Sequence, residues 1–473
     1  MKINLLLIIM AALVLGACKT ESTAITEKPI VNFDSLAITP PMGWNSWGCY
    51  GLEVNEQQVR AVADYMALHL KEYGWQYIVI DFGWYLPPEF KTAMINSKDP
   101  AQNLDQYGRL MPDTIKFPSA KNGIGFKALA GYIHSKGLKI GIHMMRGIPW
   151  DAITKATPIK GTDYFAPDVA NVNDTCPWSY FMRGVNIKKP GGQEYYNSVL
   201  ELYASWGIDM VKVEDILNPF HLDEIEGLHN AVINVEEPIV LCLSTGASPL
   251  SQMAYMAKNA HTWRIAPDFW DDWAMLKRQF AYIAQWDSVR ELIPLQNRWP
   301  DADMLPIGKL RKDGGDPWTA TVLLHSTIEK VTDEYSRFTD TEKYTLMTLW
   351  CIFKSPLMIG GYLPENDSVT CKIITNEEVI AVNQKSENNH EIRNSNGIVI
   401  WTADVPGSNA KYVALFNTND GKPEKITVSW KETGLDGELT VRDLWAKRDL
   451  GKFTGEFSAS IEAHGCKLIK VSR

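Results

Sequence analysis

The stretch Ile208-Asp209-Met210-Val211-Lys212-Val213-Glu214-Asp215-Ile216 decides how the chain is organised. It is a short apolar run that ends with a lysine and two carboxylates, which is typical of a buried strand that delivers charged groups to a site. Because side chains alternate along a strand, Lys212 and Glu214 share one face, whereas Asp215 lies on the other. A purely structural salt bridge would give the same pattern, so the stretch alone leaves both interpretations open.

Helix, glycine and strand follow one another three times along the chain. The predicted units are Val54–Tyr73, Gly74 and Tyr77–Asp81; Phe126–Lys136, Gly137 and Leu138–His143; and Tyr195–Trp206, Gly207 and the opening strand. Such units imply parallel strands joined by right-handed crossovers. Further strands are predicted at Pro40–Trp47, Pro238–Ser244, Thr262–Ile265, Asp301–Leu305 and Pro356–Ile359. The sequence therefore predicts a (β/α)8 TIM barrel, although the residues themselves show no repeat.

Polar and aromatic residues stand at the predicted strand ends, where the chemistry of such barrels takes place. Carboxylates that cluster in a cleft cost free energy unless a substrate or a cation offsets them. Carboxylates suit calcium or magnesium, but Lys212 and Arg264 already supply positive charge, so we expect no metal and no other cofactor. The residues at these ends are Trp47, Asp81, His143, Lys212 with Glu214, Ser244, Arg264 with Asp268, and Asp303.

Composition narrows the class of partner. The formal net charge of −9 and the absence of a long basic run argue against nucleic acid. The 17 tryptophans favour a carbohydrate partner only modestly, because aromatic faces stack on sugar rings but also fill cores. The cysteines after Cys18 are scattered without metal-ligand spacing, so they predict no zinc site and leave disulfides open.

The first residues predict export. Met1-Lys2 is a basic start, Leu5–Leu15 is an apolar run too short to span a bilayer, and Leu15-Gly16-Ala17-Cys18 resembles the end of a bacterial lipoprotein signal. We expect residues 1–17 to be removed, Cys18 to be lipidated and to hold the protein at a membrane of the bacterial cell envelope, and residues 18–37 to form a tether. An ordinary signal peptide is the alternative, and it would also export the protein.

Five ordered motifs between Thr39 and Asn383 resemble glycoside hydrolase family 27, the family of α-galactosidases and α-N-acetylgalactosaminidases. The motifs are Pro40–Trp47, Tyr77–Asp81, Val211–Asp215, the pair Arg264 and Asp268, and Asp301–Gly308. The resemblance implies a catalytic barrel over residues 38–385 and a C-terminal antiparallel β-sandwich over residues 386–473. In the second segment, strands are predicted at Ile398–Trp401, Tyr412–Phe416, Lys425–Trp430, Glu438–Trp445 and Ser458–Ile461.

The same resemblance implies a reaction. Family 27 enzymes hydrolyse a terminal α-linked sugar with retention, by two carboxyl groups that lie about 5 to 5.5 Å apart. The acid/base falls on Asp268, and Arg264 would help to hold the substrate or the acid. A helix N-cap in front of Phe269 is the alternative role for Asp268.

The nucleophile departs from the family pattern. The family motif is lysine, any residue, aspartate, whereas this chain has Lys212-Val213-Glu214. Glutamate carries its carboxylate on the order of 1.5 Å further, and a displacement of about 1 Å can cost about a hundredfold in rate. Three possibilities stay open: Glu214 attacks, Asp215 has taken over, or the site binds sugar without turnover. The alternation along the strand favours Glu214.

Substrate contacts also differ from the family pattern. The second strand of the family usually ends with two aspartates that contact sugar hydroxyls, whereas here Asp81 is followed by Phe82. His143 stands where the animal enzymes have tyrosine. Ser244 and Ala247 match the small pair that makes room for a 2-acetamido group in the α-N-acetylgalactosaminidases, but a tight strand-to-loop turn is the preferred interpretation of this segment. The other residues assigned to the substrate are Trp47, Trp84, Lys212, Asp215, Arg264 and Asp303, with Trp263 as a further candidate for stacking.

Three hypotheses follow from these observations. The first, which we adopt as the prediction, is a retaining exo-acting α-glycosidase that removes terminal α-galactosyl-type residues. Its substrate would be an α-galactoside or a close relative such as an α-N-acetylgalactosaminide or a β-L-arabinopyranoside. The second is a lipid-anchored carbohydrate-binding protein on a catalytically impaired barrel, which Glu214 and Phe82 motivate. The third is a barrel hydrolase that depends on a carboxylate-bound metal.

Overall fold

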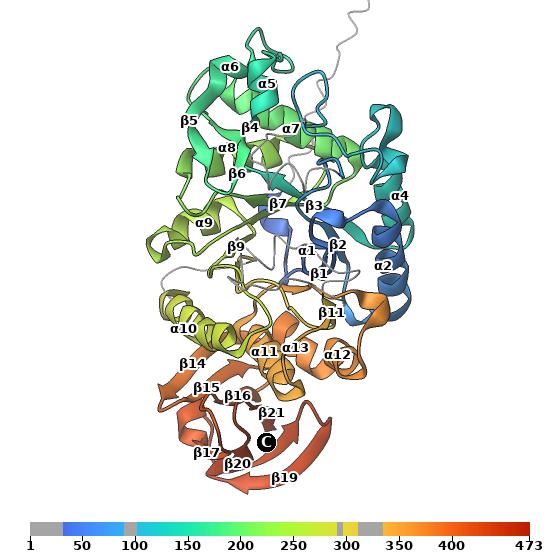
Figure 1. The fold of residues 1–473 in the computed structure, drawn as a ribbon. Coiled ribbons are helices and arrows are strands. Elements are labelled where there is room, and N and C mark those ends of the chain that lie inside the picture. Colours follow the sequence, from blue (N-terminus) through green and yellow to red (C-terminus); the bar gives the residue numbers. More distant parts are fainter. Residues whose placement is uncertain (1–31, 89–101, 291–296, 311–333) are drawn as a thin grey trace, which may run out of the picture.

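Eight parallel strands form one curled sheet in the residues that this computed structural model describes, which are 32–88, 102–290, 297–310 and 334–473 (Figure 1). The order around the sheet is β10-β9-β8-β7-β3-β2-β1-β13. The ring closes where Leu305, beyond β10, forms a parallel bridge with Ile359 of β13. The predicted barrel is therefore confirmed. Its strands are β1 (Met42–Asn45), β2 (Tyr77–Ile80), β3 (Lys139–Met145), β7 (Met210–Glu214), β8 (Val240–Leu243), β9 (Thr262–Arg264), β10 (Trp299–Asp301) and β13 (Leu357–Ile359).

One barrel strand lies earlier than predicted. The sequence predicted a strand at Asp301–Leu305, whereas β10 ends at Asp301. Asp303 has a φ of +87°, a left-handed conformation that an extended strand does not contain. The chain therefore leaves the sheet at this point and returns to it only through Leu305, which donates its N–H to Met358 O at 2.7 Å.

Helices surround the barrel. The first long one, α2, begins after Asn55, whose side chain and that of Gln58 form a capping box. Its buried face contains Val59, Val62 and Met66, whose spacing is that of an amphipathic helix. The helices are α1 (Trp47–Tyr50), α2 (Glu56–His69), α4 (Lys127–Ser135), α5 (Trp150–Thr154), α6 (Ala166–Val169), α7 (Gly192–Trp206), α8 (Leu222–Asn234), α9 (Met253–Asn259), α10 (Trp273–Arg290), α11 (Asp340–Phe353), α12 (Ser368–Ile374) and α13 (Glu377–Lys385).

The glycine before β7 ends α7 as predicted. Gly207 has a φ of +82° and donates its N–H to Ala204 O at 2.8 Å. Only glycine adopts this left-handed conformation without a steric cost, so it is suited to the end of a helix. The turn directs the chain into β7, where Val211 and Val213 are fully buried. Burial of each such side chain contributes about 1.5–3 kcal/mol.

A small antiparallel sheet is inserted between β3 and β7 (upper left in Figure 1). It consists of β4 (Ile148–Pro149), β6 (Ser179–Val185) and β5 (Ala170–Cys176), in that order. The sequence does not predict this sheet, because β5 has the polar sequence Ala-Asn-Val-Asn-Asp-Thr-Cys without a regular apolar alternation. A second small pair, β11 (Lys309–Leu310) and β12 (Glu334–Tyr335), follows β10.

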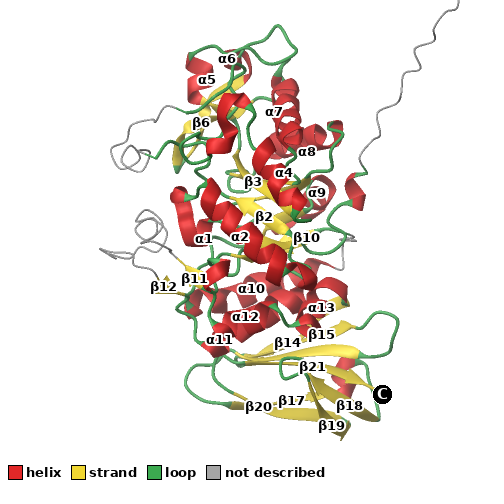
Figure 2. Cartoon of the chain, turned by 90° about the vertical axis from the view of Figure 1, so that its right-hand side faces the viewer, coloured by secondary structure: helices red, strands yellow, loops and turns green. Residues whose placement is uncertain are grey.

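The C-terminal strands form a separate antiparallel unit that packs against α10 and α11, on the side of the barrel away from the inserted sheet (Figures 1 and 2). One sheet has the order β14-β15-β16-β21-β18-β19, and β17 pairs with β20. The sequence predicted five of these strands and missed β14, β19 and β21. The bounds are β14 (Glu387–Ser395), β15 (Ile398–Asp404), β16 (Lys411–Asn417), β17 (Glu424–Ser429), β18 (Glu438–Asp443), β19 (Arg448–Thr454), β20 (Glu456–Ile461) and β21 (Cys466–Ser472).

The side chains of β15 point alternately to two hydrophobic cores, and this shows how the C-terminal unit is attached to the barrel. Val399 and Trp401 pack into the barrel core, whereas Ile400 belongs to a second core with Ile426 and Phe457 of β17 and β20. Neighbouring residues of a strand face opposite sides of a sheet, so the larger sheet lies between the barrel and the smaller sheet. The predicted β-sandwich is confirmed.

The structure bears on disulfides and on membrane-spanning helices within its described residues. Among the described residues, the six cysteines are free thiols. No helix in the described ranges has the length and apolarity that a membrane crossing requires. The predicted signal and Cys18 lie outside the described residues.

Candidate active site

A pocket of about 540 Å³ opens at the carboxyl ends of the barrel strands. In a (β/α)8 barrel this is the end at which catalytic residues lie. Its polar lining comes from four strand ends that are far apart in the sequence. The charged residues that line it are Asp81, Lys212, Glu214, Arg264, Asp268 and Asp303, and the aromatic ones are Trp47, Phe82, Trp178, Phe269 and Trp270.

Lys212 bridges two carboxylates on one side of the pocket. Its Nζ lies 2.8 Å from Asp81 Oδ2 and 2.7 Å from Glu214 Oε1. Burial alone would lower the pKa of Lys212, but Asp81 and Glu214 outweigh that effect and raise it. The ammonium therefore stays charged, and the predicted shared face of Lys212 and Glu214 is confirmed.

Asp81 is fixed by the end of β1. Asn45 donates its side-chain N–H to Asp81 Oδ2 at 2.5 Å, and the backbone N–H of Asp81 donates to Ser46 Oγ at 2.9 Å. Its other oxygen accepts the N–H of Phe82 at 2.7 Å. The side chain is thus held before any ligand arrives, which is a property of preorganised sites.

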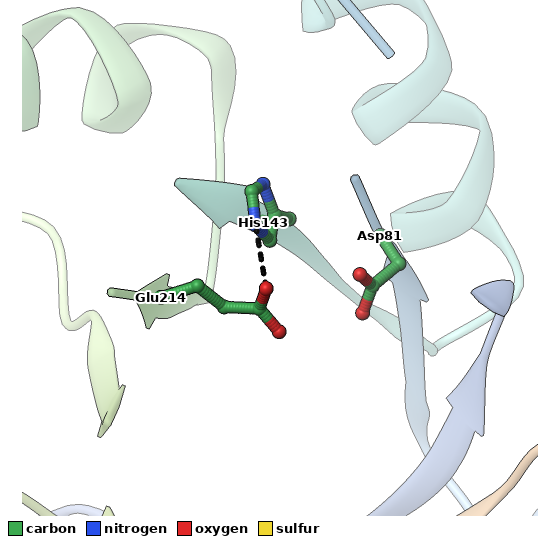
Figure 3. A group of neighbouring side chains, drawn as sticks. All are labelled: Asp81, His143 and Glu214. Carbon is green, nitrogen blue, oxygen red and sulfur yellow. Dashed lines mark ion pairs between the residues drawn. The ribbon is translucent and has the colours of Figure 1, made fainter. Parts of the chain in front are cut away.

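Glu214 is the last residue of β7, and its carboxylate projects toward Asp81 and His143 (Figure 3). Burial raises the pKa of Glu214, but the opposing effects of Lys212 and His143 are larger, so the pKa of Glu214 is well below its ordinary value. The group is therefore ionised across the neutral range. An ionised carboxylate at the edge of a pocket is the form that a nucleophile needs.

Asp215 does not reach the pocket. Its φ of +61° ends the strand, and its Oδ2 lies 2.9 Å from the guanidinium of Arg146. Arg146 also pairs with Asp174 of β5 at 2.9 Å and with Glu224 of α8 at 2.7 Å. Asp215 is therefore part of a buried ion-pair network that ties the inserted sheet to the barrel. Its predicted role as a substrate contact is wrong, because its side chain faces this network.

Arg264 joins two acids on the opposite side of the pocket. Its Nη2 lies 2.8 Å from Asp303 Oδ2 and 3.2 Å from Asp268 Oδ1. The side chain of Asp268 is 37% exposed, so a substrate can reach it. Asp268 does not cap a helix, because α10 begins only at Trp273. The N-cap alternative is therefore excluded.

Asp303 is the more shielded of the two acids that Arg264 joins. Its Oδ2 accepts the N–H of Phe269 at 2.8 Å, and its Oδ1 accepts the N–H of Met304 at 2.8 Å. Burial raises the pKa of Asp303 to about 7; Arg264 opposes this effect, and the nearby carboxylates of Asp268 and Asp301 add to it. Asp303 thus positions Arg264 and the segment that follows Asp268.

Three further residues that were assigned to the substrate do not line the pocket. Trp84 is fully buried, because its indole N–H donates to His143 O and its ring packs on Phe126 and Trp206. His143 lies behind Glu214 with 0% exposure. Ser244 is buried below the pocket, where its hydroxyl faces Arg264 at 3.5 Å.

Two further expectations, a small pair that admits a 2-acetamido group and a stacking role for Trp263, do not fit the lining of the pocket. Neither Ser244 nor Ala247 lines the pocket; Thr245 and Gly246 do, and Gly246 has a φ of +86°. The turn interpretation of this segment is therefore favoured over an opening for a 2-acetamido group. Trp263 is also buried, against Trp286, and Trp47 is the one predicted stacking residue among them that reaches the pocket.

The inserted sheet supplies a wall that sequence reasoning missed. Trp178 lies in the turn between β5 and β6, lines the pocket, and packs edge-on to Phe82 at 5.8 Å. No strand-end pattern marked it, because it belongs to an excursion outside the barrel. Only its type, an aromatic next to Pro177 in a polar segment, could have drawn attention to it.

Among the residues that the structure describes, two groups of acids and histidines have ligand atoms close enough together to hold a metal ion. They are Asp81, His143 and Glu214, and Asp174, His221 and Glu224. Each already contains a cation, since Lys212 bridges the first and Arg146 pairs with two members of the second. A divalent ion would meet this positive charge at short range, so the residues fit a metal poorly.

Comparison with known proteins gives consistent matches. The family model "Alpha galactosidase A" matches residues 39–152 and 183–320. The model "Alpha galactosidase C-terminal beta sandwich domain" matches residues 395–471. Among curated proteins, an α-galactosidase of Cyamopsis tetragonoloba is 28% identical and covers 92% of this chain and 86% of its own length.

Two solved structures are more similar. A family 27 (GH27) β-L-arabinopyranosidase of Geobacillus stearothermophilus is 42% identical, covers 93% of this chain and 98% of its own, and has a TM-score of 0.85. A putative α-N-acetylgalactosaminidase of Bacillus halodurans is 38% identical, covers 92% of this chain and 97% of its own, and has a TM-score of 0.79. The inserted sheet falls largely in the interval that the first family model leaves unmatched.

Proposed function

The chain belongs to glycoside hydrolase family 27, the α-galactosidase family, and from this we propose that it hydrolyses terminal α-galactosyl-type residues with retention of configuration. It is a glycoside hydrolase with a carbohydrate substrate. The observation that carries the proposal is that Glu214 and Asp268 line one pocket while Asp215 does not. With both carboxylates in place, a purely sugar-binding role is not favoured.

The residues fit a double displacement. Asp268 gives its proton to the leaving oxygen while Glu214 forms a bond to the anomeric carbon, and the glycosidic bond breaks. Asp268, now a carboxylate, then takes a proton from water, which attacks the same carbon and releases Glu214. Asp81 can accept hydrogen bonds from sugar hydroxyls, and Trp47 and Trp178 can pack on the apolar faces of the ring.

For the sugar itself, we propose a β-L-arabinopyranoside. This sugar has the ring configuration of α-D-galactose but lacks the hydroxymethyl group at C5. Beside Asp81, Phe82 forms an apolar wall with Trp178 and Phe181, at ring distances of 5.8 and 6.2 Å. A hydroxymethyl group would find no polar partner on this wall, and a buried hydroxyl without a partner is costly. The structure that is 42% identical is named as an enzyme for this substrate.

Nitrophenyl glycosides test this substrate proposal. We expect kcat/KM for the β-L-arabinopyranoside to exceed that for the α-galactoside by about 10- to 100-fold, the cost of one unpaired polar group. The α-N-acetylgalactosaminide should be slowest, because Thr245 and Gly246 occupy the edge where the small pair was expected. A higher value for the α-galactoside would contradict the proposal, while leaving the glycosidase function intact. Proton NMR of the first released sugar should show the retained anomer.

The Phe82→Asp variant should move the preference toward galactose. A carboxylate at this position offers the hydroxymethyl group a hydrogen-bond acceptor, so the ratio of the two kcat/KM values should shift by at least about tenfold. Phe82→Leu is the matched control, because it shortens the side chain but keeps the wall apolar, and its ratio should stay close to that of the wild type. An equal shift in both variants would mean that bulk, and not polarity, decides.

We further propose that residues 1–17 are removed, that Cys18 is lipidated, and that residues 18–37 tether the domains to a membrane of the bacterial cell envelope. The basic start, the apolar run and Leu15-Gly16-Ala17 directly before Cys18 support this.

We also propose that the catalytic barrel covers residues 38–385 and the C-terminal β-sandwich residues 386–473. This boundary is supported by the end of α13 at Lys385 and the start of β14 at Glu387.

Membrane fractionation tests the anchor. Full-length protein expressed in a bacterial host should sediment with membranes, and Cys18→Ser should move it to the soluble fraction because the acyl chain has no other attachment point. Cys371→Ser, the same chemical change in a described free cysteine, should leave the protein with the membranes. A soluble wild-type protein, or a Cys18→Ser variant that still sediments, would contradict the anchor.

A further inference from the structure

His143 lies directly behind the carboxylate of Glu214. It comes from β3, which neighbours β7 in the sheet, and its Nε2 is 3.3 Å from Glu214 Oε2 (Figure 3). The ring has 0% exposure and is enclosed by Phe82 at 5.2 Å and Tyr85 at 6.4 Å. His143 therefore touches neither solvent nor the pocket, and its polar contact is with Glu214.

Packing alone does not explain a histidine at this position. Among the described residues, neither ring nitrogen of His143 has a hydrogen bond of good geometry, so both are buried without a full partner. Burial of a polar group without a partner costs free energy, and an apolar side chain would fill the same aromatic surroundings without this cost. The short distance to Glu214 is the feature that distinguishes histidine from such a side chain.

The two oxygens of Glu214 face two different groups. Lys212 holds Oε1 at 2.7 Å, and His143 stands at Oε2. Glutamate has one more rotatable bond than aspartate, so a single anchor leaves its carboxylate free to swing, whereas two anchors fix its plane. Each carboxylate oxygen has two acceptor sites, so an anchored oxygen can still attack carbon.

We propose that His143 is a positioning residue that donates its Nε2–H to Glu214 Oε2 and thereby holds this longer nucleophile in attacking geometry. The inference rests on the proposed function. Catalytic hydrogen bonds are often long or poorly aligned before substrate binds, in keeping with the 3.3 Å separation. The proton stays on His143 throughout; the bond that forms is between Glu214 and the anomeric carbon, and the proton for the leaving group comes from Asp268.

A pair of variants separates positioning from packing. His143→Phe keeps a ring but removes the donor, and we expect it to lower kcat by about 100-fold with KM changed by less than about threefold. His143→Gln keeps an N–H donor and should recover kcat to within about tenfold of the wild type. The rate of nitrophenol release in a single turnover should fall in parallel with kcat, because attack by Glu214 is the step affected. His143→Met serves as a second donor-free variant should His143→Phe fail to fold.

A double-mutant cycle with Glu214→Asp gives the decisive test. The shorter carboxylate withdraws by on the order of 1.5 Å from His143, so the contact is already lost. In the Glu214→Asp background, His143→Phe should therefore cost less than about threefold in kcat. The inference would be overturned if the losses in kcat of His143→Phe and Glu214→Asp multiplied in full in the double variant. It would also be overturned if His143→Gln and His143→Phe lost kcat equally, or if only KM changed. A wild-type protein that turns over no glycoside would remove the proposed function and this inference with it, whereas an active wild type with an unaffected His143→Phe variant would remove only the inference.

Discussion

The Glu214→Gln variant is expected to lose about 10⁴- to 10⁶-fold in kcat while the protein remains folded. The amide has the shape of the carboxylate and can still accept a hydrogen bond from Lys212, but it cannot form a glycosyl-enzyme of useful reactivity. Because the whole reaction passes through that intermediate, the loss falls on kcat for every leaving group. The measurement is steady-state hydrolysis of a nitrophenyl glycoside, with folding checked by thermal unfolding.

Asp215→Asn is the matched control for this variant. It is the same chemical change on the next residue, but it breaks a buried ion pair with Arg146. We expect the free energy of unfolding to fall by roughly 3–5 kcal/mol, and kcat of the folded protein to stay within about tenfold of the wild type. A greater loss of kcat in Asp215→Asn than in Glu214→Gln would assign the nucleophile to Asp215.

Asp268→Asn should have the second-largest effect, and its size should depend on the leaving group. General acid catalysis contributes about 10²- to 10⁴-fold, so a disaccharide or alkyl glycoside should lose about 10³-fold or more in kcat/KM. A dinitrophenyl glycoside needs no proton to leave, and its first step should be nearly unaffected. Its second step lacks a base, so glycosyl-enzyme should accumulate, with a burst of released phenol.

Asp272→Asn is the control for the second prediction. Asp272 is exposed and lies four residues after Asp268, where its carboxylate accepts the N–H of Met275. Its replacement should change kcat/KM for any glycoside by less than about threefold. If Asp268→Asn slowed activated and unactivated glycosides equally, Asp268 would be a binding group and the acid would have to be sought elsewhere.

Local rules explain which parts of the site could be predicted. The period of two along a strand is a property of the backbone, so it correctly separated Lys212 and Glu214 from Asp215. Helix, glycine and strand units predicted the barrel, because each glycine ends a helix in a conformation that few other residues adopt. The end of β10 was predicted too late for a local reason as well, the positive φ of Asp303, which the sequence does not reveal.

Other errors concern which way a side chain faces in three dimensions. Trp84 and Ser244 stand close to strand ends, as true pocket residues do, but turn into the core. Trp178 was missed because it reaches the pocket from the inserted sheet, whose polar strands carry no apolar period. Such residues are placed by tertiary packing, which a sequence pattern does not encode.

The closure of the barrel at Leu305 has a mechanical consequence. Neighbouring strands elsewhere are joined by ladders, whereas here two backbone hydrogen bonds, to Met358 and from Gly360, hold the cylinder shut. We therefore expect this line to open more readily than the β3–β7 ladder, whose register joins five residue pairs. Asp303 lies two residues before Leu305, so opening of the barrel at this line would move Asp303 away from Arg264. The side of the pocket that holds Asp268 would then lose order, whereas the side that holds Glu214 would keep its geometry.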